Sequence, residues 1–140
     1  MPDRDKVLQV VREWVMKAES DLKAAAYLLT LGSDCPTDAV GFHAEQCVEK
    51  YLKAFLVSAG IEFPKSHNIR VLVALLPPEG RPSLGDEDQA VLTDYATGAR
   101  YPGWGEIPLV QARHAVAVAR RVRMQMRGTL PAEVLRRRKT

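Results

Sequence analysis

The stretch over residues 42–67 constrains the fold most, because it has the pattern of one long amphipathic helix followed by a break. Its apolar side chains recur three, four and seven positions apart, which places them on one face at about 3.6 residues per turn. Gly60 and Pro64 then end the helix, since glycine tolerates a left-handed helix end and proline removes a backbone donor. A polar stripe runs beside the apolar face, and its side-chain heads are expected to point into one small volume. The stripe consists of His43, Gln46 and Lys50.

The same spacing of apolar residues continues through most of the chain, between loops rich in proline and glycine. No alternating run is long enough to suggest a sheet, and no internal repeat is visible. The sequence therefore predicts an all-α, antiparallel up-and-down helical bundle of about five helices with a long N-terminal helical hairpin. The expected helices cover residues 5–31, 37–59, 68–76, 85–97 and 109–127, with a last short turn over 131–135.

A length of 140 residues suits one domain, which we expect over residues 1–130, followed by a basic tail over 131–140. The start of the chain lacks the apolar run of a signal peptide, and no apolar stretch is long enough to span a membrane. With two isolated cysteines as well, the expected location is the cytoplasm. The scattered His and Cys residues and the lack of a phosphate-binding Gly loop predict neither a metal nor a cofactor.

The net charge of +3 is distributed unevenly along the chain. From Arg113 onward there are nine Lys or Arg residues and one acidic residue, Glu133, so the C-terminal fifth forms a cationic arm. Such asymmetry is typical of contact with nucleic acid, phosphate or an acidic partner. A solvated helix face followed by a charged tail explains it equally well, and the sequence leaves both interpretations open.

Two segments together resemble a known family. The segment HAEQCVEKYLKAFLVSAGIEFPKSHNIRVL, residues 43–72, is similar to the signature of HEPN domains, small helical proteins named for nucleotide binding in higher eukaryotes and prokaryotes. The later ARYPG, residues 99–103, resembles the same group. This resemblance implies a helical bundle that pairs into a homodimer. In bacteria it also implies a minimal nucleotidyltransferase partner, in two-component modules that resemble toxin and antitoxin.

Many HEPN relatives are metal-independent ribonucleases that carry an Arg four to six residues before a His. This chain departs from that pattern, since none of His43, His67 and His114 has an Arg at that upstream spacing. We therefore expect an interaction module that binds a nucleotide or a partner, and activity as an enzyme is the less expected outcome. The alternatives are a ribonuclease with a non-standard site, or an RNA-binding accessory that uses the basic arm.

Three groups of residues are candidates for ligand binding, and each has a structural alternative. His43 can carry a proton near neutral pH or bond to a neighbouring helix. Lys65 and His67 precede a helix start, where anions bind, although Ser66 or His67 can equally cap that helix. Arg100 and Tyr101 offer a guanidinium and an aromatic face, or anchor their loop. The full candidate set is His43, Gln46, Lys50, Lys65, His67, Arg100 and Tyr101, with no catalytic residues and no metal ligands assigned.

Two further expectations concern packing. Glu45, Glu49 and Lys53 are spaced four residues apart, which favours ion pairs along an exposed helix face. In the ARYPGWGEIP loop, Tyr101 and Trp104 are large enough to pin the loop onto the bundle.

Overall fold

The computed structural model describes residues 3–136, the side chain of Arg100 excepted, and every regular element in that range is helical. The predicted all-α bundle with a long N-terminal hairpin is confirmed. Four short 3-10 turns connect or follow the main helices, at Gly32–Asp34, Pro78–Gly80, Gly98–Arg100 and Ala132–Val134 (η1 to η4). The main helices are α1 Arg4–Leu29, α2 Thr37–Ser58, α3 Ile69–Leu75, α4 Asp86–Ala96 and α5 Leu109–Arg127.

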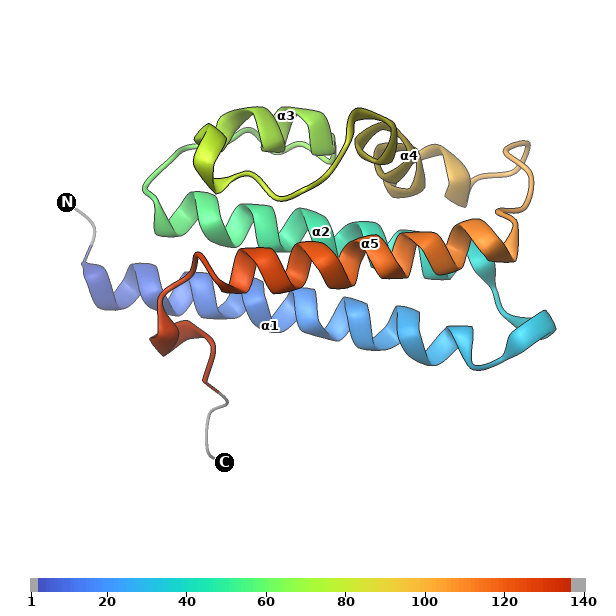
Figure 1. Ribbon diagram of the computed structural model, residues 1–140, viewed down its shortest axis with the longest axis horizontal. Helices are drawn as coiled ribbons and strands as arrows, with labels where there is room; N and C mark the ends of the chain where they lie inside the picture. Colours follow the sequence, from blue (N-terminus) through green and yellow to red (C-terminus); the bar gives the residue numbers. More distant parts are fainter. Residues whose placement is uncertain (1–2, 137–140) are drawn as a thin grey trace.

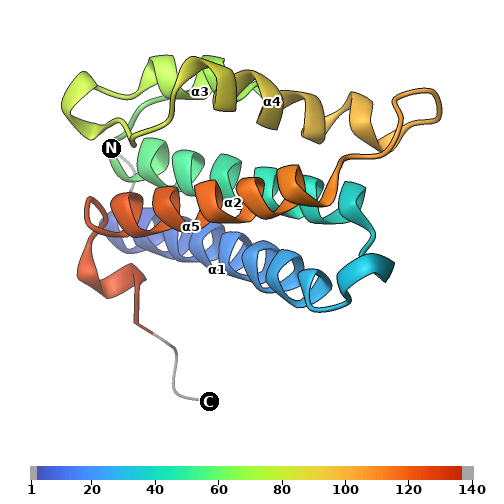
Figure 2. The same cartoon turned by 45° about the vertical axis from the view of Figure 1, so that its right-hand side comes forward.

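Helix α2 is the centre of the bundle, because it packs against each of the other four main helices. Helix α1 runs antiparallel to it on one side, while α5 runs alongside both (Figure 1). The short helices α3 and α4 form a separate layer over α2, on the side away from α1 (Figure 2). With neighbours on so many sides, more than half of α2 is buried, and that includes three of its charged side chains.

The helix ends follow local sequence signals closely. Helix α5 has the predicted bounds, and Gly60 adopts a φ of 72° just after α2, as its position predicted. Helix α3 begins one residue later than predicted, because its cap is Asn68, whose side chain accepts from the Arg70 backbone N–H at 2.9 Å. Ser66 instead accepts from the backbone N–H of Asn68, and His67 does not cap the helix.

The loop between α4 and α5 is anchored differently from the prediction. Tyr101 and Trp104 stay 62% and 47% exposed, so the expectation that both rings pin the loop onto the bundle is wrong. Trp104 lies on the backbone of Gly98, where an added Cβ would come within 2.9 Å of its ring. Instead of these two rings, the side chain of Ile107 is buried in the core, where it packs against Gly41 of α2.

The chain after α5 returns to the start of α1 (Figure 2). Val134 is buried there, Glu133 pairs with Arg4 at 2.9 Å, and the Glu133 carbonyl accepts from Arg12. The described part of the predicted tail, residues 131–136, therefore packs as part of the bundle. The rest of that tail, residues 137–140, lies outside the described residues. Within residues 3–136, no helix combines the length and apolarity needed to cross a bilayer.

Candidate ligand-binding site

The predicted polar stripe of α2 splits into two networks. His43 donates from Nδ1 to Asp21 of α1 at 2.8 Å, and Lys50 reaches the other oxygen of the same carboxylate at 2.5 Å. Gln46 turns away from them and donates to Glu45 and Glu49 at 2.9 and 3.1 Å. The expected convergence therefore holds for His43 and Lys50, around a carboxylate of another helix, and is wrong for Gln46.

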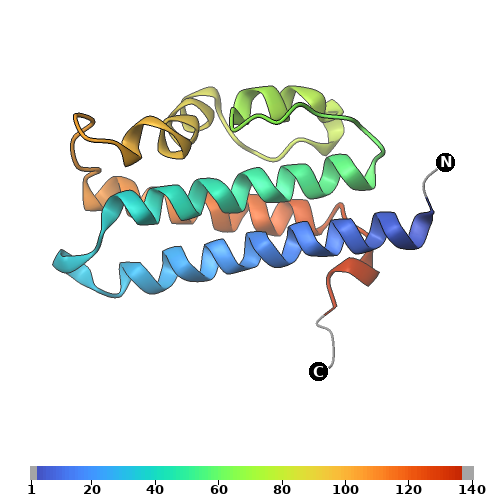
Figure 3. The ribbon, with the colours of Figure 1, turned by 180° about the vertical axis from the view of Figure 1, so that it is seen from behind.

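The second network contains two buried carboxyl groups. Glu45 is 0% and Glu49 2% exposed, so the expected exposure of this face is wrong, although the expected ion pair between Glu49 and Lys53 is present at 3.7 Å. After α2 the chain turns back and runs above the end of that helix to α3 (Figure 3). This loop brings His67 to Glu49 and Phe63 to Lys53, and Trp14 of α1 also lies next to Lys53. Burial, followed by the nearby charge of Glu49, raises the pKa of Glu45 to about 8.

Glu49 has two basic side chains next to its carboxylate. His67 Nδ1 lies 2.8 Å and Lys53 Nζ 3.7 Å from Glu49 Oε1. The Lys53 ammonium also lies over the rings of Trp14 and Phe63, at 5.5 and 6.0 Å from their centroids. We call the polar residues of this helix the α2 polar face, and both of its lysines are matched to carboxylates. The α2 polar face consists of His43, Glu45, Gln46, Glu49, Lys50 and Lys53.

The remaining predicted residues are not assembled with the α2 polar face into one site. Lys65 is exposed in the loop after α2, whereas Tyr101 lies in the loop before α5, and these loops are at opposite ends of the bundle (Figure 1). The side chain of Arg100 lies outside the described residues. Among the later candidates, His67 joins a network that includes an α2 residue, through Glu49.

A different place in the molecule has the features of an anion site. A cavity of about 670 Å³ opens between α1, α5 and the segment after α5. Four arginines and one glutamate line it, together with an apolar wall of Val15, Met16, Val134 and Leu135. We call it the basic pocket, and its charged residues are Arg12, Glu19, Arg123, Arg127 and Arg136.

Glu19 orders two of these arginines. Arg123 donates to it from Nε and Nη2 at 2.7 to 2.9 Å, in the fork geometry that guanidinium and carboxylate share, and Arg127 donates from Nη1 at 3.2 Å. Burial alone would raise the pKa of Glu19, but the hydrogen bond and the charge of Arg123, with the charge of Arg127, lower it. One carboxylate therefore faces four guanidinium groups, and the pocket keeps a positive surplus.

Donors remain available for a ligand. Arg123 uses two of its three nitrogens on Glu19, and Arg127 uses only Nη1, which also donates to the Tyr51 hydroxyl at 3.3 Å. Arg136 makes no hydrogen bond or ion pair with a described residue. Guanidinium groups with free forks bind phosphate and carboxylate oxygens, so the pocket suits an anion.

Part of this site was visible in the sequence. Arg123 and Arg127 are four residues apart on one face of a predicted helix, which marks a local basic stripe. Their partner Glu19 and the opposite wall with Arg12 come from more than a hundred residues earlier, and no local pattern connects them. No three side chains of the metal-ligating types converge on a common point in residues 3–136.

Comparisons place the chain in a family. The sequence profile of the HEPN domain matches residues 11–128, while comparison with curated proteins finds no match. The fold is similar to TT1696 from Thermus thermophilus, with a TM-score of 0.69 and 24% identity over 86% of this chain and 98% of that one. It is also similar to ST0689, an archaeal HEPN homologue, with a TM-score of 0.61 and 26% identity over 85% and 96%. Because the profile covers most of its length, this chain belongs to the HEPN domain family.

Proposed function

We propose that this HEPN domain is a binding module that holds a nucleotide, or a terminal nucleotide of RNA, in the basic pocket and performs no cleavage there. The observation that carries the proposal is the surplus of guanidinium groups around one cavity, four against a single carboxylate. Phosphate is the anion that such forks match best, through paired hydrogen bonds.

The shape and lining of the pocket support a nucleotide over a bare phosphate. A volume of about 670 Å³ lies in the range of small-molecule sites, which far exceeds what one phosphate needs. The apolar wall beside the arginines offers Met16 and Leu135 for a base or ribose to lie against. A ligand with an anionic end and a flat, weakly polar end fits both halves of the pocket.

The absence of cleavage is proposed from the position of the histidines. Ribose attack on a phosphodiester needs a group that accepts a proton next to the bound phosphate. His43, His67 and His114 do not line the basic pocket, and arginine stays protonated. The Glu19 carboxylate does line it, but its oxygens accept from Arg123 and Arg127, and its lowered pKa makes it a weak base. The proposal keeps, as expectations, the homodimer and the nucleotidyltransferase partner that the family resemblance implies and the cytoplasmic location expected from the sequence.

One observation favours a ribonuclease as the second candidate. Asp21 binds Nδ1 of His43, which leaves Nε2 of a half-buried imidazole free to exchange a proton, with the Lys50 ammonium next to the same carboxylate. This arrangement is one that general acid–base catalysis uses. It lies outside the basic pocket and its positive surplus, which makes it the weaker candidate.

Fluorescence anisotropy with a labelled adenine nucleotide and a labelled RNA oligomer tests the proposal. The variant Arg12→Ala/Arg136→Ala removes two charges from opposite walls of the pocket, and affinity should fall about tenfold or more, with a shallower salt dependence. The control Arg113→Ala/Arg120→Ala removes the same charge from exposed positions of α5 outside the pocket and should change affinity less than about twofold.

If both double variants lost the same affinity, the effect would come from net charge alone, and the basic pocket would be rejected as the binding site. Saturable binding that neither variant weakens would also reject it. The same RNA, incubated with a chelator and resolved by gel electrophoresis, should stay intact. Cleavage that His43→Ala abolishes would establish the second candidate instead.

A further inference from the structure

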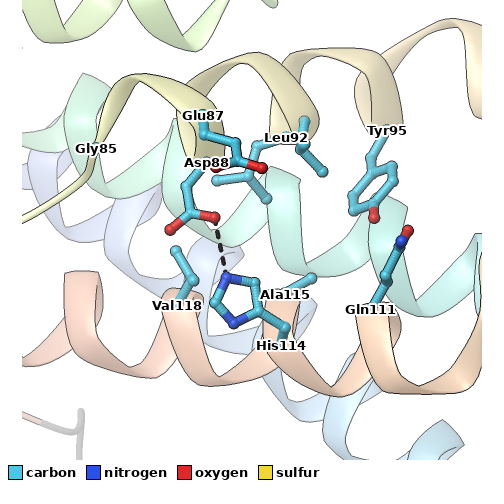
Figure 4. A pocket seen from close by; sticks show the side chains of 10 residues that line it. Gly85, Glu87, Asp88, Leu92, Tyr95, Gln111, His114, Ala115 and Val118 are labelled. Atoms are coloured by element: carbon cyan, nitrogen blue, oxygen red, sulfur yellow. Dashed lines mark hydrogen bonds and ion pairs between the residues drawn. The ribbon is translucent and has the colours of Figure 1, made fainter.

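A second cavity, of about 490 Å³, lies between α4 and the first half of α5 (Figure 4). It is separate from the basic pocket, which uses the second half of α5. Residues spaced three and four apart on each helix point into it, so both walls are regular helix faces. We call it the α4–α5 cavity, and its polar lining consists of Glu87, Asp88, Tyr95, Gln111 and His114.

The cavity exists because α4 is held by other helices. Helix α4 packs on α2 and α3. The α5 residue that lines the cavity opposite Leu92 is Ala115, whose side chain is small. Leu92 and Ala115, with Val91 and Val118, give the cavity an apolar floor. One hydrogen bond crosses between the helices, from His114 Nε2 to Asp88 at 2.9 Å (Figure 4).

Tyr95 is the sign that the cavity is built for a ligand. Its side chain is only 4% exposed, and the ring lies on Gly41 of α2, where an added Cβ would come within 3.1 Å of it. The hydroxyl nevertheless bonds to no described residue and points towards Gln111 across the cavity (Figure 4). The hydroxyl is the accessible end of this nearly buried side chain, so it can donate to and accept from a molecule that enters the cavity.

The charges around the cavity select the kind of ligand. Glu87 is exposed at the rim and forms no ion pair with a described residue. Asp88 adds a second carboxylate, held by His114 and with Arg121 3.9 Å away. Carboxylate, hydroxyl and amide oxygens outnumber the donors that face the cavity, which favours a donor-rich cation and disfavours a phosphate.

The two polar ends lie seven residues apart along α4, from Asp88 to Tyr95, which is roughly 10 Å of helix. We propose that the α4–α5 cavity binds a small amphipathic amine. Its ammonium lies against Glu87 and Asp88, its apolar body covers Leu92 and Ala115, and its far polar group bonds to the Tyr95 hydroxyl and the Gln111 amide.

Three probes of one size test each part of this assignment. Tyramine has the ammonium, the ring and the hydroxyl, 4-ethylphenol lacks the ammonium, and 4-hydroxyphenylacetate replaces it with a carboxylate. We expect tyramine to bind saturably in titrations followed by protein NMR, with shifts at Gln111, His114 and Tyr95. 4-Ethylphenol should bind about three- to tenfold more weakly, and 4-hydroxyphenylacetate should not saturate.

Two variants locate the site. Tyr95→Phe removes only the hydroxyl, Glu87→Gln removes only the exposed charge, and each should weaken tyramine about three- to tenfold. Glu79→Gln removes an equally exposed carboxylate outside the cavity and should change nothing. Thermal melts check the fold of each variant, and the Glu87 change, made on the surface, keeps the test valid if the Tyr95 variant unfolds.

The proposal fails if tyramine does not saturate. It also fails if the carboxylate analogue binds as well as tyramine, or if affinity is the same in Glu87→Gln as in Glu79→Gln. The Arg12→Ala/Arg136→Ala variant of the basic pocket should bind tyramine normally, so this result and the nucleotide result are independent of each other.

Discussion

The α2 polar face and the basic pocket contain the same kinds of charged side chain but balance them differently. On the α2 polar face, each lysine meets a carboxylate, and the carboxyl groups are nearly all satisfied within the chain. In the basic pocket, the single carboxylate of Glu19 faces four arginines. Both regions combine side chains from different helices, so the difference lies in the surplus and not in how each is assembled.

That difference separates a stabilising network from a binding site. Charges that neutralise each other in a buried region hold the helices in register, and a ligand would have to compete with the internal partners. At an open cavity, guanidinium groups in excess of the carboxylates have no carboxylate partner within the chain, so we propose that an external anion binds to them. Substitutions that change one charge or hydrogen bond at a time test whether stability and nucleotide binding respond separately.

The largest effect is expected at Glu45, on the α2 polar face. Its pKa rises from an ordinary 4.5 to about 8 in the folded protein, so the folded state holds a proton that the unfolded chain releases. The contribution of Glu45 to stability should therefore be greatest below pH 4.5 and should fall as the pH rises to about 8. Glu45→Gln keeps the shape without the titration, and should be more stable than the parent by a few kcal/mol at pH 9.

Urea unfolding between pH 4 and pH 9 measures this effect. The parent and Glu45→Gln should have similar unfolding free energies at pH 4 and should diverge as the pH rises, while the exposed Glu79→Gln follows the parent throughout. If the Gln variant lost stability with the same slope as the parent, another group of the network would be responsible for the pH dependence.

Asp21 is next, because one carboxylate of α1 holds two side chains of the α2 polar face. Asp21→Asn leaves the half-buried Lys50 ammonium without its counter-charge and should lower the unfolding free energy by about 1–3 kcal/mol. Nucleotide affinity should stay within about twofold, since Asp21 does not line the basic pocket. Urea unfolding and anisotropy on the same preparation measure both, with the exposed Asp94→Asn as control. A large loss of nucleotide affinity would mean that the α2 polar face and the basic pocket act as one site.

The sequence predicted the helices well because their limits depend on local chemistry. The end of α2 at Gly60 and both ends of α5 follow from glycine, proline and apolar spacing, and they are correct. The pairing of charges was predicted poorly, because it depends on partners distant in sequence. Asp21 lies 22 residues before His43, and nothing local marks it as the acceptor.

Burial was the other quantity that spacing alone did not give. Glu45 and Glu49 have the spacing of an exposed helix face, yet both are buried, because α2 has neighbours on several sides. A helix that contacts four others has little free surface, so some of its polar residues are buried, while His43 and Lys50 stay partly exposed. The roles of Lys65 and Tyr101 in ligand binding stay predictions, since each lies at a different end of the bundle and away from the basic pocket.

Glu19 should respond in the opposite sense to Asp21. Glu19→Gln removes the only negative charge of the basic pocket while a Gln oxygen can still accept from Arg123. Nucleotide affinity should therefore rise about three- to tenfold, or roughly 1 kcal/mol, and stability should fall by no more than about that amount at this partly exposed position. Anisotropy titration at two salt concentrations measures the gain, which should shrink at the higher one. An affinity that falls would mean that Glu19 is needed to aim the arginines.

The smallest effect tests the link between the core and the basic pocket. Tyr51 is fully buried, its hydroxyl accepts from Arg127 Nη1 at 3.3 Å, and it helps to lower the pKa of Glu19. Burial raises the pKa of Tyr51 to about 12, so the hydroxyl keeps its proton. Tyr51→Phe preserves the ring and should cost about 0.5–1.5 kcal/mol in urea unfolding.

Nucleotide affinity in Tyr51→Phe should change less than about twofold, because Arg123 still holds Glu19 and Arg127 still donates to it. This result would show that Glu19 holds the arginines of the basic pocket in position and that the Tyr51 hydroxyl contributes to stability alone. An affinity loss as large as that of Arg12→Ala/Arg136→Ala would mean the reverse. The hydroxyl would then set the position of Arg127, and the distinction between a stabilising network and a binding site would fail at Tyr51, a core residue that bonds to an arginine of the pocket.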